Sequence, residues 1–249
     1  MAIHYRTPGI VIKKEDKGEA DQVFTIYTKD FGKLEVLGKA IRKIKSKLRA
    51  GTEPFYLSEI EFIQGKTYKT LTDAILIERF EILKKDLKRL AISYRISETL
   101  NTLVRIQEPD KKIWQLLNEV FQKLNNPQLP IPNYHLLYYY FLWNLLSLLG
   151  YQPELYNCAV CQKKIMPGRI YFNSKEGGVI CFTCFKKIRE RHTTRPDCCR
   201  EIHSDIVKIL RIILKKDWNI LARLKMETLH QKMLKAISTD FLLAIHPRR

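Results

Sequence analysis

The chain has 249 residues, 45% of them hydrophobic, which is long enough for one large domain or two to three small ones and too apolar for a disordered protein. Lys and Arg number 44 against 26 Asp and Glu, so the formal net charge is +18. An excess of this size favours nucleic acid or an acidic membrane surface as a partner.

The N-terminus has no apolar core long enough for a secretory signal. The most hydrophobic run, residues 136–151, is too short to span a bilayer and contains Asn144 and Ser147, so we expect it to be a buried helix. Six cysteines without a secretory signal indicate a reducing, cytoplasmic compartment, in which thiols serve as metal ligands rather than disulfides.

The first 80 residues predict a β domain. Short apolar or alternating runs are separated by turn sequences such as "DKGEAD" and "KDFGK", and Gly65 lies at the turn of a hairpin. Five short strands with a basic helical insert between the third and the fourth are typical of a small closed barrel, most often the five-stranded OB barrel. The strands are expected from Ile10, over 23–28, from Leu34, and in the two arms of a hairpin over 58–74.

The basic insert, "KAIRKIKSKLR", holds six cations in eleven positions without an acid, and Ile41, Ile44 and Leu48 recur at helical spacing. One interpretation is a solvated helical face. The other is a surface for a single nucleic-acid strand, because the insert would lie beside a barrel face and near rings on which bases stack. Of these rings, Tyr27, Phe31, Phe55 and Tyr56, we expect Phe55 to be core. The candidate phosphate-binding residues are Lys39, Arg42, Lys43, Lys45, Lys47 and Arg49.

Helical periodicity begins near Ile82. An apolar stripe over 113–124 predicts a helix that starts at Asp110, and another helix precedes it. Asn133 is a candidate N-cap and Gly150 a candidate helix stop. Helical spacing returns from about Glu201 to Ile245, with a break near Asp217. We therefore expect a helical domain over 81–157 and 200–249.

A four-cysteine module over 158–199 interrupts the helices. Two C-x2-C pairs, with nineteen residues between them, match the spacing of a zinc ribbon, and "RIYFNSKEGGVIC" predicts a hairpin that turns at Gly177 and Gly178. Four thiolates close the metal's shell, so one structural zinc per chain is expected, and redox-active thiols are the alternative. Cys198 and Cys199 match neither pair. The expected ligands are Cys158, Cys161, Cys181 and Cys184.

The sequence contains no Gly-rich phosphate loop, H-E-x-x-H motif or nucleophile elbow, so we do not expect an enzyme. Two classes compete with DNA binding: an RNA-binding zinc-ribbon factor of transcription or translation and, less favoured, a nuclease. Annealing of DNA without ATP or a divalent metal distinguishes the first reading from both.

Several motifs resemble those of the bacterial DNA repair protein RecO family. They are Y-R-T-x-G-I-V at 5–11, G-E-x-D at 18–21, T-x-D-x-G-K at 28–33, S-K-L-R at 46–49, Pro-Phe at 54–55, and L-G-x-x-P-x-L-x-x-C-x-x-C at 149–161. They occur in the family's order over nearly the whole chain. One departure is Gly38-Lys39-Ala40, where the family usually has Ala-Lys-Gly.

The resemblance implies an α+β multidomain protein with an N-terminal OB barrel, a helical domain and an inserted zinc module. It further implies a recombination mediator that binds single- and double-stranded DNA, anneals complementary strands and works with RecR to load RecA onto strands coated by SSB. The implied partners are DNA, RecR and the acidic C-terminal tail of SSB, with RecF and RecA involved indirectly and no membrane.

Overall fold

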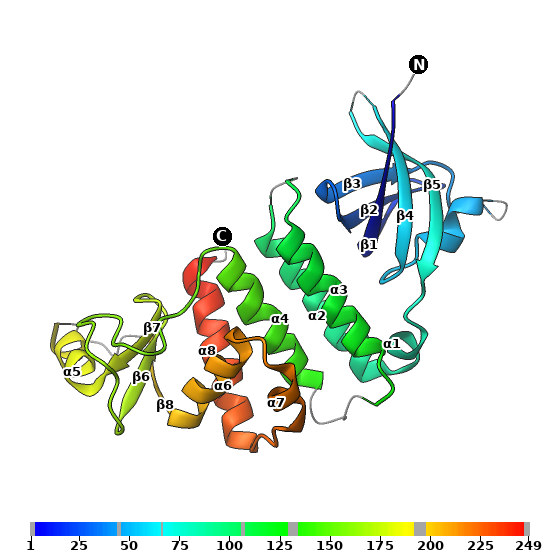
Figure 1. The fold of residues 1–249 in the computed structure, drawn as a ribbon. Coiled ribbons are helices and arrows are strands. Elements are labelled where there is room, and N and C mark those ends of the chain that lie inside the picture. The colour runs from blue at the N-terminus through cyan, green and yellow to red at the C-terminus, as the bar shows by residue number, and fades with distance from the viewer. Residues whose placement is uncertain are drawn as a thin grey trace. The chain divides into compact units, whose positions relative to one another are not determined.

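The computed structural model describes residues 3–43, 46–65, 67–105, 108–128, 134–191 and 198–246. The chain forms two compact units, Met1–Leu129 and Pro130–Arg249. The first contains a barrel and three helices, and the second contains further helices and a small three-stranded sheet (Figure 1).

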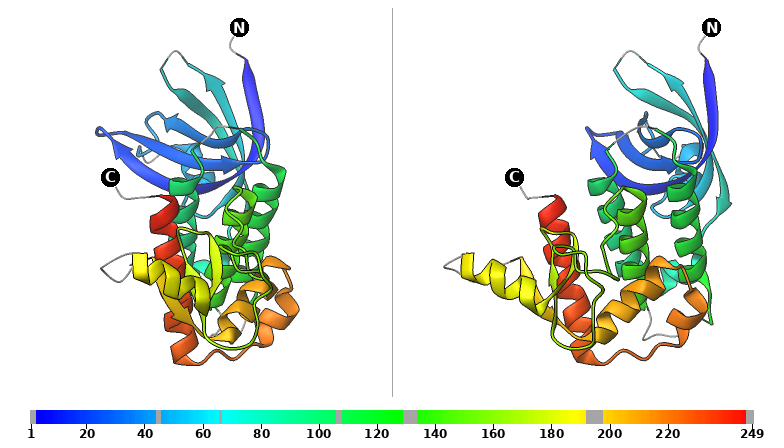
Figure 2. Two further views of the ribbon diagram at one scale, coloured as in Figure 1. Left: turned by 90° about the vertical axis from the view of Figure 1, so that its left-hand side faces the viewer. Right: turned by 60° about the vertical axis from the view of Figure 1, so that its left-hand side comes forward.

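Five strands form the closed barrel that the sequence predicts. The order around the barrel is β1-β2-β3-β5-β4, and β4 returns to β1. Both views of Figure 2 show the strands curling round a common interior. The closed five-stranded arrangement is that of an OB-like barrel, which confirms the predicted fold class. The strands are β1 (His4–Lys17), β2 (Asp21–Thr28), β3 (Gly32–Gly38), β4 (Leu57–Gln64) and β5 (Lys69–Glu78).

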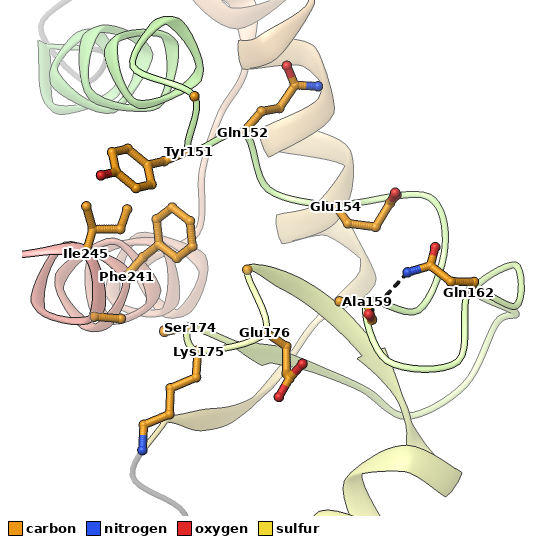
Figure 3. Close-up of a pocket in the computed structure, with 13 residues that line it drawn as sticks. Tyr151, Gln152, Glu154, Ala159, Gln162, Ser174, Lys175, Glu176, Phe241 and Ile245 are labelled. Atoms are coloured by element: carbon orange, nitrogen blue, oxygen red, sulfur yellow. Dashed lines mark hydrogen bonds between the residues drawn. The ribbon is translucent and has the colours of Figure 1, made fainter.

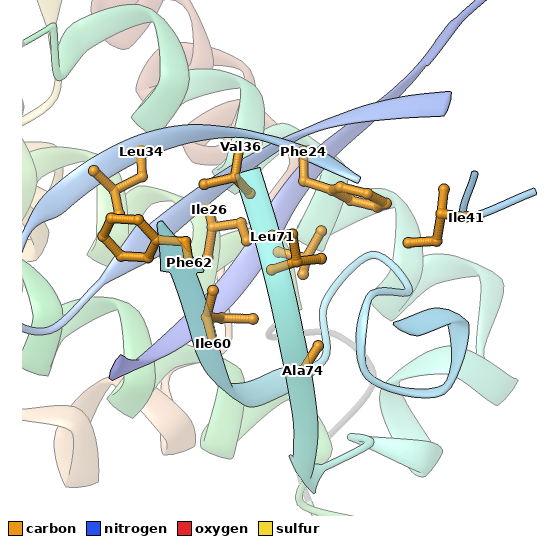
Figure 4. Close-up of a cluster of buried hydrophobic side chains, with 10 residues drawn as sticks. Phe24, Ile26, Leu34, Val36, Ile41, Ile60, Phe62, Leu71 and Ala74 are labelled. Atoms are coloured by element: carbon orange, nitrogen blue, oxygen red, sulfur yellow. The ribbon is translucent and has the colours of Figure 1, made fainter. Parts of the chain in front are cut away.

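Alternation along the strands places one set of side chains inside the barrel. Phe24 and Ile26 point inward from β2, and Ile60 and Phe62 do so from β4 (Figure 4). Ile41, which follows β3, completes this core and is fully buried. The other core members are Val11, Leu34, Val36, Leu71 and Ala74.

The barrel closes through a short seam. The parallel strands β3 and β5 share two register pairs, Val36 with Lys69 and Leu37 with Thr70, whereas β1 and β2 share eight. The short 3-10 helix η1 (Lys47–Gly51) lies against β5 so closely that a side chain at Gly51 would collide with the backbone of Ala74. The segment between β3 and β4 therefore covers the barrel near its thinnest seam.

Three helices complete the first unit: α1 (Glu81–Lys85), α2 (Leu87–Leu103) and α3 (Lys111–Asn125). Helix α3 matches the predicted stripe, and the Asp110 carboxylate caps it by accepting the N–H groups of Lys112 and Ile113. Phe121 of α3 contacts the ring of Phe55 at 5.8 Å between centroids, so α3 is joined to the barrel through aromatic packing. The division predicted at residue 80 stays a prediction.

Helices α4 (Tyr134–Leu148), α6 (Ser204–Leu214), α7 (Trp218–Arg223) and α8 (Thr228–Ile245) form the body of the second unit. Helix α4 is buried on all sides, as predicted for the apolar run. Its Trp143 donates a hydrogen bond to Ser238 of α8 at 3.1 Å, and its Asn144 donates to the Ile213 carbonyl of α6 at 3.0 Å. Two buried polar groups are thus paired between helices.

The helix boundaries follow from local signals. Gly150, with φ of 88°, ends α4, and the Tyr151 N–H returns to the Leu146 carbonyl at 2.8 Å. The predicted break near Asp217 is confirmed, because the Asp217 carboxylate caps α7. The predicted cap at Asn133 lies outside the described residues.

The inserted module contains the predicted hairpin. Strands β6 (Ile170–Asn173) and β7 (Gly178–Cys181) are antiparallel, and helix α5 (Phe182–Arg191) follows β7 directly. A third strand, β8 (Cys199–Ile202), pairs with β6 where helical spacing was expected to return, so the helix begins only at Ser204. The ring of Tyr171 stacks on Phe185 of α5 at 3.7 Å between centroids, which attaches α5 to the sheet.

In the part of the chain that the structure describes, no helix combines the length and the apolar character needed to cross a bilayer.

Candidate functional site

The two C-x2-C pairs converge in the inserted module. Cys158 and Cys161 lie in a turn closed by the Gln162 N–H, which donates to the Cys158 carbonyl at 2.8 Å. Cys181 ends β7, and Cys184 lies in the first turn of α5. The four Sγ atoms all lie within 4.8 Å of one another, and those of Cys161 and Cys181 are 3.9 Å apart. The chain thus brings together all four predicted ligands.

This spacing fits a tetrahedral metal. Zinc bonds to thiolate at about 2.3 Å, which places two sulfur ligands about 3.8 Å from each other. The Cys181 N–H also donates to Cys158 Sγ at 3.4 Å, so the backbone orients one sulfur. The donor set therefore fits zinc, and four thiolates would leave it no open position for water.

The local electrostatics favour a thiolate at Cys158. Burial would by itself raise the pKa of Cys158, but hydrogen bonds from the N–H groups of Cys161, Cys181 and Val160 outweigh it and lower this pKa to about 7. Burial, with the hydrogen bonds to neighbouring thiols, raises the pKa of Cys184. Metal-free, the cluster would thus concentrate its negative charge on Cys158, and a divalent cation would stabilise the remaining thiolates.

Cys198 and Cys199 stay outside this cluster, as their spacing indicated. Cys199 is buried on β8 and Cys198 is half-buried, and both pack against the apolar residues around the four thiols. Burial, followed by the charge of Cys198, raises the pKa of the Cys199 thiol to about 12. These two thiols contribute to the module's packing.

A cavity of about 620 Å³ separates the module from α8 (Figure 3). Phe241 and Ile245 give it an apolar side, while Lys175 and Glu176 approach from the module and Glu154 from the segment that leads into it. Hydrogen bonds from the backbone N–H groups of Asn157 and Tyr156 lower the pKa of Glu154, so this carboxylate is ionised at neutral pH. Two carboxylates and one lysine make the cavity a poor match for an acidic ligand.

The basic insert is not the continuous helix that we predicted. Residues 39–43 form turns, and η1 supplies the only helical turn among the described residues of the insert. Ala40, with φ of 51°, leaves the right-handed helical region, and the segment is instead held to the β1–β2 turn: the Arg42 N–H donates to the Ala20 carbonyl at 3.0 Å and the Ala40 N–H to Asp21 Oδ1 at 2.7 Å. Tertiary contacts to the β1–β2 turn therefore override the helical spacing.

Apolar anchors hold this insert on the barrel and leave its cations in solvent. Ile41 is buried in the core and Leu48 packs against it (Figure 4 labels Ile41). Lys45, and Ile44 of the predicted apolar spacing, lie outside the described residues. The other five predicted phosphate-binding side chains are exposed: Lys39, Arg42, Lys43, Lys47 and Arg49.

Arg42 and Arg49 line a small polar hollow of about 150 Å³ together with Lys14 of β1. Glu53 also lines it and forms an ion pair with Lys14 at 3.0 Å. Arg42 is held in place by Asp16 at 3.5 Å. The hollow thus has three cations and one carboxylate on its wall, so its charge suits an anion.

Lys84 and Tyr56 adjoin this hollow. Lys84 Nζ lies 3.6 Å from the centroid of the Tyr56 ring, an attractive cation–π contact. Burial is the main cause that lowers the pKa of Lys84 to about 8. The charge of Lys14 lowers this pKa further, and the charge of Glu53 partly offsets the shift by raising it. Lys84 therefore changes charge close to neutral pH.

Three of the four rings considered for base stacking are parts of the packed structure. Tyr27 is fully buried, Phe55 is core as expected, and Phe31 packs on Tyr5 and Phe62. Stacking on Tyr27 was therefore a wrong expectation, because Tyr27 lies on the face of β2 opposite Ile26, outside the barrel core, and is nevertheless fully buried there. The fourth ring, Tyr56, contacts the cation of Lys84.

Sequence reasoning missed Lys14 and left Lys84 without a role at this surface. Both lie far along the chain from the insert: the barrel fold brings Lys14 next to Arg42 and Arg49, and α1 brings Lys84 near Lys14 and Glu53. No local pattern could have identified them.

Family models match both parts of the chain. Residues 1–80 match the family described as recombination protein O N terminal, and residues 84–244 match recombination protein O C terminal.

Curated relatives extend over most of the chain and bear one name. A DNA repair protein RecO of Dehalococcoides mccartyi (strain ATCC BAA-2266) is 32% identical over 221 residues, which cover 89% of this chain and 82% of the relative. Another, from Thermoanaerobacter sp. (strain X514), is 27% identical over 241 residues, 95% of this chain and 90% of the relative. A third, from Moorella thermoacetica, is 33% identical over 183 residues, 72% of this chain and 66% of the relative. With both family models matched in order, the chain belongs to the recombination protein O family.

Proposed function

We propose that this protein is a recombination mediator of DNA repair that binds single- and double-stranded DNA through the basic face of its barrel. It anneals complementary strands without nucleotide hydrolysis and, together with RecR, helps to load RecA onto SSB-coated strands. The protein acts as a binding and annealing factor in the cytoplasm, near the nucleoid, and not as an enzyme. The relatives' shared name and the two family matches support the repair role.

The observation that carries this proposal is the anion-suited hollow formed by Lys14, Arg42 and Arg49 on the outside of the barrel. A phosphate entering it would meet three cations, and Arg offers paired N–H donors to phosphate oxygens. The neighbouring exposed cations Lys39, Lys43 and Lys47 extend the positive surface along the insert. Contacts to phosphates do not depend on the identity of the bases, so we expect similar affinity for DNA of every sequence.

We further propose that one structural zinc occupies the four-cysteine cluster. Cys158, Cys161, Cys181 and Cys184 would hold it, with their Sγ atoms already within 4.8 Å of one another. Zinc would supply no chemistry to DNA here; it would fix the turn, β7 and the start of α5 as one body.

A charge-reversal variant tests the DNA proposal. Arg42→Glu with Arg49→Glu should weaken binding of a single-stranded oligonucleotide by about 100-fold at moderate salt, and annealing of complementary strands should slow accordingly. The matched control is Lys111→Glu with Lys112→Glu, which makes the same charge change at two exposed lysines of α3 in the same unit. Equal losses in both variants would mean that net charge, and not this face, determines binding.

The same assay separates the RNA-binding alternative. Barrels of this type and four-cysteine modules also occur in RNA-binding proteins, so the oligonucleotide is offered as DNA and as RNA of one sequence. We expect annealing of DNA strands with neither ATP nor a divalent metal added. A strong preference for structured RNA would instead support the alternative.

The protein partners follow from the family resemblance: RecR, the acidic tail of SSB, and indirectly RecF and RecA. The tail combines carboxylates with an apolar end, so it needs an apolar pocket bordered by cations. The cavity beside α8 has the apolar side but is bordered by Glu154 and Glu176 (Figure 3). We therefore propose that the tail binds the helical part of the chain outside this cavity. Glu154→Gln with Glu176→Gln should then leave binding of a labelled tail peptide to the full chain unchanged.

A further inference from the structure

Three metal-binding side chains meet where β8 passes into α6, in a place that shares no residue with the four-cysteine cluster. His203 is the N-cap residue of α6, Asp205 lies in the first turn of α6, and His230 lies in the first turn of α8. One ligand atom from each lies within 4.8 Å of the other two. The residues come from two helices that are distant in sequence, so the fold and not a local motif creates the cluster.

The distances within the cluster are close to those of a coordination sphere. His203 Nδ1 lies 3.1 Å from Asp205 Oδ2, and the rings of His203 and His230 are 5.2 Å apart between centroids. Nitrogen and oxygen ligands at about 2.0–2.1 Å from a tetrahedral metal are separated by about 3.3 Å. The first pair is therefore already at ligand spacing, and a metal on His203 Nδ1 would replace the hydrogen bond that this nitrogen accepts from the Asp205 N–H at 3.3 Å. A ligand atom of His230 lies within 4.8 Å of both.

The carboxylate is oriented by a neighbour, as metal-binding carboxylates commonly are. Lys208 Nζ donates to Asp205 Oδ1 at 2.8 Å, which leaves Oδ2 on the side of the imidazoles. One oxygen of the carboxylate is thus held by Lys208, and the other is directed at the cluster.

The cluster is open to solvent. The side chain of His203 is 54% exposed and that of Asp205 is 40% exposed. A metal held by three protein groups would keep open positions for water, unlike the closed shell of four thiolates. Ions can therefore enter and leave from the solvent.

We infer that His203, Asp205 and His230 form a second, exchangeable site for a divalent late transition metal such as Zn²⁺ or Ni²⁺. Two imidazoles and one carboxylate suit these borderline ions, whereas Mg²⁺ and Ca²⁺ prefer all-oxygen sites. A bound ion would join the end of β8 to the first turn of α8. It would add a second link between these two elements to the ion pair of Arg200 of β8 with Asp240, at 2.9 Å, which lies further along α8, and so brace the module against the helical body.

Nickel uptake by the untagged full chain tests this site. Protein carrying zinc on its four cysteines is dialysed against metal-free buffer and titrated with NiCl2 by calorimetry, and bound nickel and zinc are counted after gel filtration. The site variants are His230→Ala and His203→Ser, since serine preserves a helix N-cap while removing the imidazole. The matched control is His4→Ala, which removes another exposed histidine beside a carboxylate, His4 Nδ1 being 2.8 Å from Glu61 Oε1.

The wild type and His4→Ala should each take up about one nickel ion per chain with micromolar affinity, and each site variant should lose at least tenfold in affinity. Zinc should stay at about one per chain in every variant, which shows that the four-cysteine site and the module persist. Failure of the wild type to take up nickel, or equal affinity in the wild type and both site variants, overturns the inference.

Discussion

The four-cysteine cluster and the basic face of the barrel are built in opposite ways. The cluster gathers four thiols within 4.8 Å, one on the last residue of a strand, one in the first turn of a helix and two in a hydrogen-bonded turn. The basic face consists of Lys14 on β1, the exposed cations of the insert, and Lys84 on α1. The apolar side chains of Ile41 and Leu48 hold the insert on the barrel. We expect metal binding by the cluster to require all four thiols, whereas DNA binding by the basic face should persist when one cation is removed.

Replacing one ligand of the cluster should have the largest effect. Cys161→Ser removes an Sγ that lies 3.9 Å from that of Cys181, and with it much of a metal-binding free energy of about 10 kcal/mol that also stabilises the fold. We expect loss of zinc and unfolding of the module, measured by metal analysis and by proteolysis. Cys198→Ser is the control. Cys198 lies outside the cluster, so this variant should retain its zinc. A zinc-free Cys161→Ser protein with an intact module would make the cluster as tolerant as the basic face.

Replacing one cation of the basic face should cost far less. Arg49→Ala removes one wall of the hollow, so single-strand affinity should fall about tenfold and the slope of log affinity against log salt should change by about 0.7. Fluorescence anisotropy at four salt concentrations measures both. A loss as large as that of the double charge reversal would show that the face depends on one residue, as the cluster does.

The backbone of the insert offers a smaller test, on stability. Ala40 has φ of 51°, in the left-handed region that costs a residue with a Cβ about 1 kcal/mol. Ala40→Gly should raise the free energy of unfolding by about 0.5–1 kcal/mol in urea denaturation. Gly18→Ala is the converse change, because Gly18 has φ of 63° and open space around it, and should lower stability by a similar amount. Destabilisation by Ala40→Gly would contradict the expectation.

The smallest expected effect is a pH dependence of DNA affinity. It would arise from Lys84, a cation of the basic face whose charge depends on its buried environment. Burial lowers the pKa of Lys84 to about 8 from 10.5, so its charge is complete well below pH 8 and is lost as pH rises through 8. If Lys84 contacts a phosphate, DNA affinity should fall about threefold between pH 7 and 9. Lys84→Arg stays charged over this range and should abolish that fall. An equal fall in DNA affinity in the wild type and in Lys84→Arg would show that Lys84 does not contact the phosphates.

The free energy of unfolding changes with pH in the opposite direction to the DNA affinity. Between pH 8 and 10.5 the unfolded chain holds the Lys84 proton that the folded chain has released, so this residue contributes a rise in the free energy of unfolding over that window.

The sequence predicted what depends on local pattern. Alternation identified the strands of the barrel, the apolar stripe and Asp110 identified α3, and the spacing of four cysteines identified a cluster that the fold assembles. What it missed depends on contacts between distant segments. Residues of β8 were taken for helix because their strand character comes from pairing with β6. Lys14 became part of the hollow through the barrel fold, and the insert is held to Ala20 and Asp21 with Ala40 at a positive φ, instead of forming a continuous helix.

The short seam between β3 and β5 has a consequence for amide exchange. With two register pairs, it is the part of the barrel where local opening breaks the fewest contacts, so the amides of β3 and β5 near Val36 and Lys69 should exchange with solvent before those between β1 and β2. The insert leaves β3 at this end, and η1 lies against β5. An anion that immobilises Arg42 and Arg49 would therefore also slow the opening of the barrel, and ligand binding would be recorded as protection of amides that the ligand never touches.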